Sequence, residues 1–169
     1  MKKIIFVSLS LLIASFVSIA ANRNVDTRTI INTINGYKEV SGVEIVSVGK
    51  LGLGLVKSIT NLSAESKEEK AILALLNGVN KLVVVNYEDA TVEKQKELNT
   101  QLSGLFNNVE KILEFKDEEE TVHIYGTSSN NGKSINDLMI FIPKDFTLIC
   151  ALGSIRTEKI ADLIKFANE

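Results

Sequence analysis

The stretch TVHIYGTSSNNGKSINDLMIFI, residues 121–142, carries the clearest structural signal in this sequence. Asn131-Gly132 lies between two strand-like runs, and this dipeptide suits a type I′ turn because both central residues of that turn need a positive φ. The stretch therefore predicts an antiparallel hairpin with these two residues as its loop. The register that follows pairs Asn130 with Lys133, Tyr125 with Leu138, Ile124 with Met139, His123 with Ile140 and Val122 with Phe141.

This register divides the hairpin side chains between two faces. The first face consists of Val122, Ile124, Met139 and Phe141, and the second of His123, Tyr125, Leu138, Ile140 and Ile142. The second face mixes polar and apolar groups, so it supplies a candidate ligand or partner surface. We assign five residues to this surface: His123, Tyr125, Asn136, Leu138 and Ile140.

Helical and strand patterns alternate outward from the hairpin. Downstream, Pro143 marks a turn, residues 146–153 form a final strand, and a closing helix begins between Ser154 and Thr157. Upstream, we expect helices over 27–35, 51–62, 66–77 and 91–107, the last with a possible extension to Leu113, and strands over 42–49 and 81–89. The run at 81–89 is apolar enough for a strand buried on both faces.

This element order predicts an α/β (α+β) fold. We expect a single mixed five-stranded sheet that ends in an antiparallel three-strand meander and packs against about five helices. No proline-rich or glycine/serine-rich linker interrupts the chain, so one domain is expected over residues 21–169.

The first twenty residues have the pattern of a secretory signal peptide. Lys2 and Lys3 precede an uncharged apolar run, and Ser18 and Ala20 are small residues at the positions expected before a cleavage site. The run is short for a transmembrane anchor, and no basic cluster follows it. We therefore expect cleavage near Ala20 and a periplasmic or secreted chain without a stable membrane anchor.

The single cysteine, Cys150, excludes an internal disulfide. Apolar neighbours surround it, which favours a buried and inert thiol over a reactive one. The chain has 19 Lys and Arg against 21 Asp and Glu, so it lacks the basic character of a nucleic-acid-binding protein.

The glycine-rich stretch VSVGKLGLGLVKSITN, residues 46–61, superficially resembles a phosphate-binding loop. A Walker loop has the pattern GxxxxGK[ST]. With Lys57-Ser58 as its last pair, the two glycines belong at positions 56 and 51, but Val56 and Leu51 occupy these places. The dinucleotide-binding pattern fails as well, because Lys57 stands where its third glycine belongs. The stretch is better interpreted as a strand-to-helix junction.

The sequence offers no convincing metal-binding or catalytic motif either. His123 is the sole histidine, which excludes a multi-histidine metal site, and a half-buried strand histidine is favoured over a general base. The acidic stretch 114–121 lacks the ligand spacing of a calcium loop and suits a solvated turn. No serine has the context of a nucleophile elbow. We assign no catalytic, cofactor-binding or metal-binding residue and no cofactor.

Several apolar segments resemble an exported Bacteroidota family, the domain of unknown function number forty-two fifty-two. These are GVEIVSVGK, NKLVVVNYED, TVHIYG, INDLMIFI and, above all, FTLICALGSIRTEKIADLIKF. The resemblance implies an α/β domain outside the cytoplasm with no established activity. It also hints at a link to envelope stress or regulation.

Two hypotheses on function follow. The first is a non-enzymatic domain that binds an envelope protein, another envelope component or a second copy of itself, because strands as apolar as 137–142 and 147–152 need cover on both faces. The alternative is a small-ligand-binding protein or hydrolase with a pocket around His123 and Tyr125.

Overall fold

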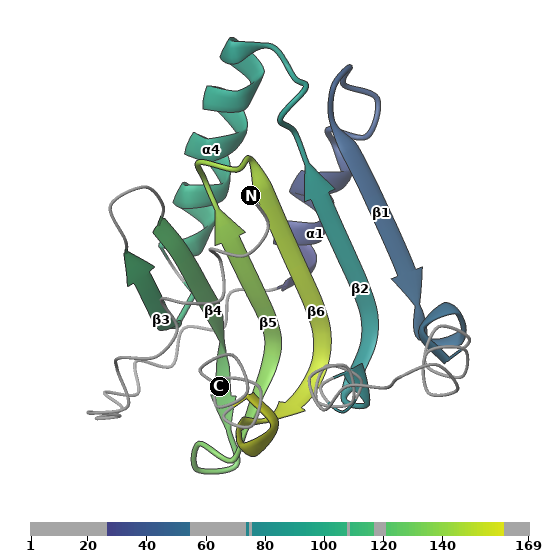
Figure 1. Cartoon of the computed structure of the whole chain (residues 1–169), viewed down its shortest axis with the longest axis vertical. Helices are drawn as coiled ribbons and strands as arrows, with labels where there is room; N and C mark the ends of the chain where they lie inside the picture. The colour runs from purple at the N-terminus through teal and green to yellow at the C-terminus, as the bar shows by residue number, and fades with distance from the viewer. Residues whose placement is uncertain (1–26, 55–73, 75, 108, 117–120, 161–169) are drawn as a thin grey trace, which may run out of the picture.

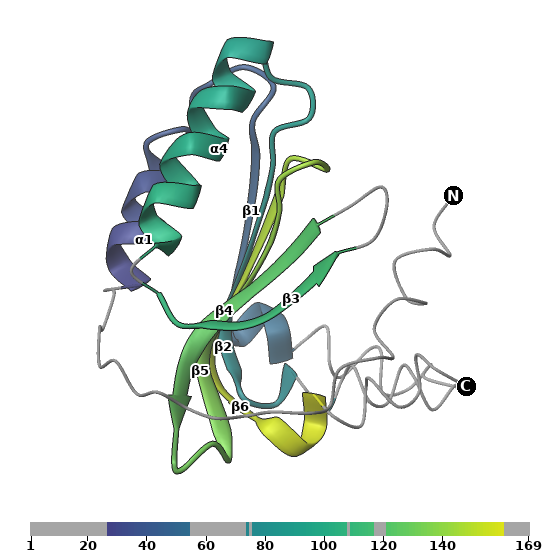
Figure 2. The same ribbon diagram turned by 90° about the vertical axis from the view of Figure 1, so that its left-hand side faces the viewer.

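A computed structural model describes residues 27–54, 74, 76–107, 109–116 and 121–160 (Figure 1). These residues form a six-stranded antiparallel sheet in the order β1-β2-β6-β5-β4-β3. Its strands are β1 (Glu44–Gly49), β2 (Val79–Asn86), β3 (Lys111–Lys116), β4 (Thr121–Ser129), β5 (Ser134–Ile142) and β6 (Thr147–Arg156). Helices α1 (Thr27–Asn35) and α4 (Val92–Phe106) both pack on one side of the sheet (Figure 2).

A single sheet in an α+β fold is confirmed, but the prediction of five strands in a mixed sheet is wrong. The additional strand is β3, which replaces the expected helix extension to Leu113 and part of the turn expected at 114–121. Its pairing with β4 places Glu114 opposite His123. The short segment KILEFK has no decisive pattern of its own, so this long-range pairing determines its conformation.

The hairpin register is correct near its turn and wrong beyond it. Thr127 pairs with Asn136 and Ser129 with Ser134, as expected, but Tyr125 pairs with Met139 instead of Leu138. The shift arises at a β-bulge, where Asp137 adopts a positive φ of 52° and adds one residue to β5. The other corrected pairs are Ile124 with Ile140 and His123 with Phe141.

The bulge also corrects the predicted faces. Met139 and Phe141 share a face with His123 and Tyr125, whereas Ile140 shares the opposite face with Ile124. A one-residue slip reverses the face of every side chain that follows it, which is why one bulge redistributes the whole strand.

The hairpin loop also differs from the expected two-residue turn. Asn131 and Gly132 have positive φ, as predicted, but Asn130 also has a φ of 52°, and the ladder ends at Ser129 and Ser134. The loop therefore has four residues, Asn130–Lys133. Asn130 donates its side-chain amide to Ser134 Oγ at 3.0 Å, which ties the loop to β5.

Strand β6 is longer than predicted. The strand expected to end at Gly153 continues to Arg156, whereas the closing helical segment begins at Thr157, within the range of 154–157 expected for it. The Ser154 amide donates to the carbonyl of Gly78 at 2.9 Å, so this end of β6 is held by its neighbours in the sheet. Long-range pairing again outweighs a local signal for the end of the strand.

The hydrophobic core lies between the sheet and the two helices. Ile30 and Ile34 of α1 are buried, as are Leu98, Leu102 and Phe106 of α4. They pack against the inward side chains of the sheet, which include Val83, Val85, Met139, Phe141, Leu148 and Cys150. The expected helices over 27–35 and 91–107 are thus confirmed, and α4 begins with Thr91 as its N-cap.

The expectation that β2 is buried on both faces is wrong. Val83 and Val85 are buried, whereas Leu82 and Val84 on the opposite face are only half-buried. Helices α1 and α4 cover only the face that bears Val83 and Val85, which produces this alternation (Figure 2). Residues 50–54 are helical, as expected for the start of the helix at 51–62, and residues 74 and 76 of the helix expected at 66–77 are helical too. The rest of these two helices and most of the closing helix lie outside the described residues.

Candidate functional site

An apolar row crosses the face of the sheet opposite α1 and α4 (Figure 2). Strand register joins one side chain from each strand: Val46, Val84, Ile149, Ile140, Ile124 and Leu113. Strands lie about 4.8 Å apart, so the row is roughly 24 Å long. We call these six residues the apolar row.

Every member of the apolar row retains contact with solvent. Val46 is 56% exposed and the other five are half-buried. Helices α1 and α4 do not cover this row, because both lie on the opposite face of the sheet (Figure 2). A continuous apolar surface of this kind is typical of an interaction site.

Covered and polar residues border the apolar row on its two sides. On one side, the next residues of the same face, such as Val48 and Leu82, pack against the buried Leu53. On the other side, Glu44, Asn86 and Thr147 form a polar border beside β1, β2 and β6, in which Asn86 Nδ2 donates to Thr147 Oγ1 at 3.4 Å. On β5 the buried Ile142 continues this line, so the border is polar only at the β1, β2 and β6 end of the apolar row.

The sheet also carries a charged cluster where β3 meets β4, on the face that bears the helices. Glu114 lies 2.5 Å from Lys111 Nζ and 2.9 Å from Lys116 Nζ. Hydrogen bonds from Lys111 and then Lys116 lower the pKa of Glu114 to about 2. These two lysines satisfy the carboxylate, so the cluster is explained as an ion-pair network.

His123 is adjacent to this cluster. Its Nδ1 lies 3.0 Å from Glu114 Oε2, a distance suited to an ion pair when the ring is protonated, but the atom is buried and makes no hydrogen bond. Phe141 is stacked beside the imidazole with ring centroids 6.3 Å apart. The half-buried strand histidine expected from the sequence is the arrangement observed.

Of the other predicted site residues, only Tyr125 lies beside His123, with ring centroids 6.1 Å apart. Tyr125 is buried and its ring stacks on Phe106 at 4.4 Å. Asn136 lies beyond the bulge and pairs with Thr127 and Ser154. Ile140 belongs to the apolar row, and Leu138 packs in the covered region beside it. The five residues therefore divide between the two faces of the sheet.

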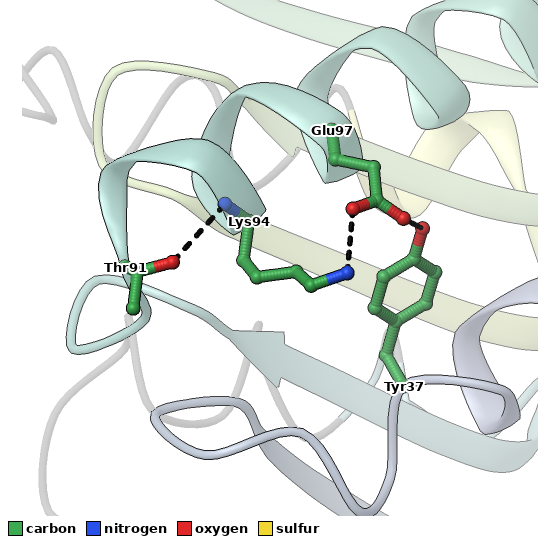
Figure 3. A network of polar contacts seen from close by, with 4 residues as sticks. All are labelled: Tyr37, Thr91, Lys94 and Glu97. Carbon is green, nitrogen blue, oxygen red and sulfur yellow. Dashed lines mark hydrogen bonds and ion pairs between the residues drawn. The ribbon is translucent and has the colours of Figure 1, made fainter.

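A polar network fastens α4 to the segment that follows α1 (Figure 3). The Tyr37 hydroxyl donates to Glu97 Oε1 at 2.9 Å, and Lys94 Nζ lies 2.6 Å from Glu97 Oε2. Burial, together with the hydrogen bond to Glu97, raises the pKa of Tyr37 to about 12. The network is structural, because each of its charged groups already has a protein partner.

Cys150 lies in the core, as expected. Its side chain is fully buried, and burial raises the pKa of its thiol to about 12. Within the described parts of the chain, no three His, Cys, Asp or Glu side chains are grouped as metal ligands would be. Among the described helices, none is long and apolar enough to span a membrane.

Sequence reasoning missed two groups that organise the structure. Val46 was noted only as a strand residue, although its exposure makes it the most accessible member of the apolar row. Asp137, the bulge residue, accepts hydrogen bonds from Thr27 and Gly153. An aspartate inside an otherwise apolar strand was the available signal, since Asp is unfavourable in strands and tolerates a left-handed conformation.

A family model described as a domain of unknown function, DUF4252, matches residues 37–163. The match includes every strand and α4. No curated protein and no solved structure matches the chain.

Proposed function

This chain belongs to the DUF4252 family, whose domain has no assigned function, and we propose that it is an exported, non-enzymatic domain that binds a protein of the cell envelope through its apolar row. The proposal rests on one observation above all. Six apolar side chains form an unbroken line across all six strands, on the face that carries neither α1 nor α4.

The composition of the row supports a protein partner. It contains only Val, Ile and Leu side chains, which offer no group for hydrogen bonding to a polar small molecule. Burial of such side chains yields about 25 cal/mol for each Å² removed from water, so a complementary apolar surface would supply the binding energy. The polar border of Glu44, Asn86 and Thr147 then resembles the rim of an interface.

Residues 1–20 support export, because their pattern is that of a secretory signal peptide. An exported chain meets the proteins of the cell envelope, so we propose a partner among them. Association with an envelope stress or regulatory system remains part of this proposal.

Site-specific photo-crosslinking tests the proposal. A photoreactive side chain is introduced at Val46, within the apolar row, or at Val92, which is 60% exposed at the start of α4 on the other side of the sheet. The two positions are matched in residue type and exposure. In cells that produce the protein, we expect a discrete cross-linked envelope protein from position 46 and none from position 92.

A salt series adds a second criterion. Salt screens interactions between charges and leaves apolar contacts unaffected, so the yield of cross-linked product from position 46 should be unchanged when ionic strength is raised. Equal cross-linking from both positions, or none from position 46, would contradict the proposal.

A further inference from the structure

The two edges of the sheet differ in how well they resist strand addition. At the β3 edge, a bulge between Lys111 and Leu113 interrupts the ladder, and Lys111, Glu114 and Lys116 add charges. Bulges and charged side chains are the usual devices that protect an edge strand from pairing with another chain. The β3 edge is therefore protected.

The β1 edge has no bulge, and its charge is limited to Glu44 at its first position. Its pairing with β2 runs without a shift from Glu44–Asn86 to Gly49–Lys81. Its sequence, EIVSVG, contains no proline or lysine, and Val46 is 56% exposed. Because no described strand lies on its outer side, β1 offers a regular row of backbone N–H and C=O groups.

The sequence of β1 is complementary to itself when two copies run antiparallel with Ser47 opposite Ser47. In this register Val46 of each copy lies opposite Val48 of the other, and Glu44 lies next to Lys50, the first residue of the helical segment that follows β1. Glu44 and Lys50 are exposed, so both are accessible for such a contact. Two-fold symmetry makes each of these pairings occur twice.

We propose that two copies of this chain pair through β1 in this register and join their sheets into one of twelve strands. Even-numbered residues of one copy pair with even-numbered residues of the other, so the faces opposite α1 and α4 lie on the same side of the joined sheet. The neighbouring register, with Val46 opposite Val46, would instead place Glu44 opposite Val48 and leave its charge unpaired.

This inference concerns the sheet edge and the proposed function concerns the sheet face; Val46 belongs to both surfaces, so the two proposals are distinguished by separate measurements. A monomeric protein that still cross-links through position 46 to an envelope protein would overturn the dimer alone. A dimer without envelope cross-linking would overturn the proposed function alone.

Cysteine cross-linking tests the register. Ser47→Cys places two thiols directly opposite each other across the two-fold axis, at a separation from which a disulfide can form. Val46→Cys is a control for the neighbouring register, in which the two Val46 residues would face each other. Val92→Cys is a control for an exposed thiol on α4, away from the sheet edge. Under mild oxidation of the purified protein, we expect Ser47→Cys to form the covalent dimer about tenfold faster than either control. Equal rates for all three variants, or a faster rate for Val46→Cys, would overturn the proposed register.

Charge exchange tests the pairing without a covalent link. Glu44→Lys alone, or Lys50→Glu alone, places like charges next to each other twice, so each should weaken the dimer about tenfold in sedimentation equilibrium. The double variant restores opposite charges and should recover the dimer. A wild-type protein that stays monomeric at all concentrations, or a double variant no better than the singles, would overturn the proposal.

Discussion

The carboxylate of Asp137 on β5 accepts a hydrogen bond from the backbone amide of Gly153 on β6 at 3.0 Å. Its second oxygen accepts the hydroxyl of Thr27, the first residue of α1, at 2.8 Å. One side chain thus joins the bulge to the neighbouring strand and to a helix. The bulge in turn determines which face of the sheet receives Met139 and Phe141.

Replacing Asp137 should destabilise the protein. Asp137→Ala removes both hydrogen bonds and a residue that tolerates a positive φ, so we expect a loss of about 2–3 kcal/mol in the free energy of unfolding, measured by urea denaturation. Asp137→Asn keeps an acceptor and the same tolerance and should lose less. Asp145→Ala, an exposed turn substitution, is the control, and an equal loss there would contradict the role of the bulge.

The charged cluster should make stability depend on pH. Lys111 and Lys116 lower the pKa of Glu114 from its usual 4.5 to about 2. The ionised carboxylate therefore stabilises the fold above pH 4.5, and this contribution is lost as the pH falls toward 2. We expect the Tm of the wild type to fall more steeply over this interval than that of Glu114→Gln.

The exposed Glu39 provides a control for this pH dependence. Glu39→Gln should show the same fall in Tm between pH 4.5 and pH 2 as the wild type. If Glu114→Gln shows the same fall in Tm as the wild type, the ion pairs of Glu114 contribute nothing to stability.

The hydrogen bond between Tyr37 and Glu97 should contribute measurably to the attachment of α4. Tyr37→Phe removes the donor without changing the ring, and we expect a loss of about 1 kcal/mol in unfolding free energy. In a double-mutant cycle with Glu97→Ala, which removes the acceptor, the two losses should not add, because each substitution abolishes the same hydrogen bond. Additive losses would show that the contact carries no coupling energy.

Two glycines should respond in opposite ways to alanine. At Gly78 a Cβ would lie 1.9 Å from the carbonyl oxygen of Ser154, so Gly78→Ala must displace β6 and should cost about 3 kcal/mol or more. At Gly104, within α4, a Cβ would meet nothing within 4 Å, and Gly104→Ala should stabilise the protein by about 0.5–1 kcal/mol. Urea midpoints of the two variants would test this difference in sign.

Cys150 should be unreactive in the folded protein. Burial, with a smaller effect from the charge of Asp137, raises the pKa of its thiol to about 12. At about pH 8 we expect no reaction with a thiol reagent until the protein is unfolded in concentrated urea. The exposed thiol of Ser47→Cys should react in the folded state. Rapid modification of Cys150 would contradict its burial.

Local patterns in the sequence were sufficient where the signal lies within one element. The spacing of Ile30 and Ile34 predicted α1, and the leucines Leu98 and Leu102 predicted the inward face of α4. The Asn-Gly turn correctly predicted the hairpin and its register as far as Thr127 and Asn136. In each case the residues that form the element are neighbours along the chain.

The candidate site was less predictable. His123 and Tyr125 were placed together correctly, but Leu138 and Ile140 were assigned to their face and belong to the opposite one. The apolar row combines residues from six strands, so no single segment of sequence contains its pattern. Val46 acquires its importance only through its position at the end of this row.

The sequence by itself determined that this chain forms an α+β sheet with amphipathic helices, because hydrophobic period and turn chemistry act over a few residues. Only the tertiary structure decided that KILEFK forms a strand, that β6 continues through Gly153, and that β5 shifts by one residue at Asp137. Each of these depends on hydrogen bonds between residues far apart in the chain. The side of the sheet on which an apolar residue lies is therefore a property of the assembled sheet.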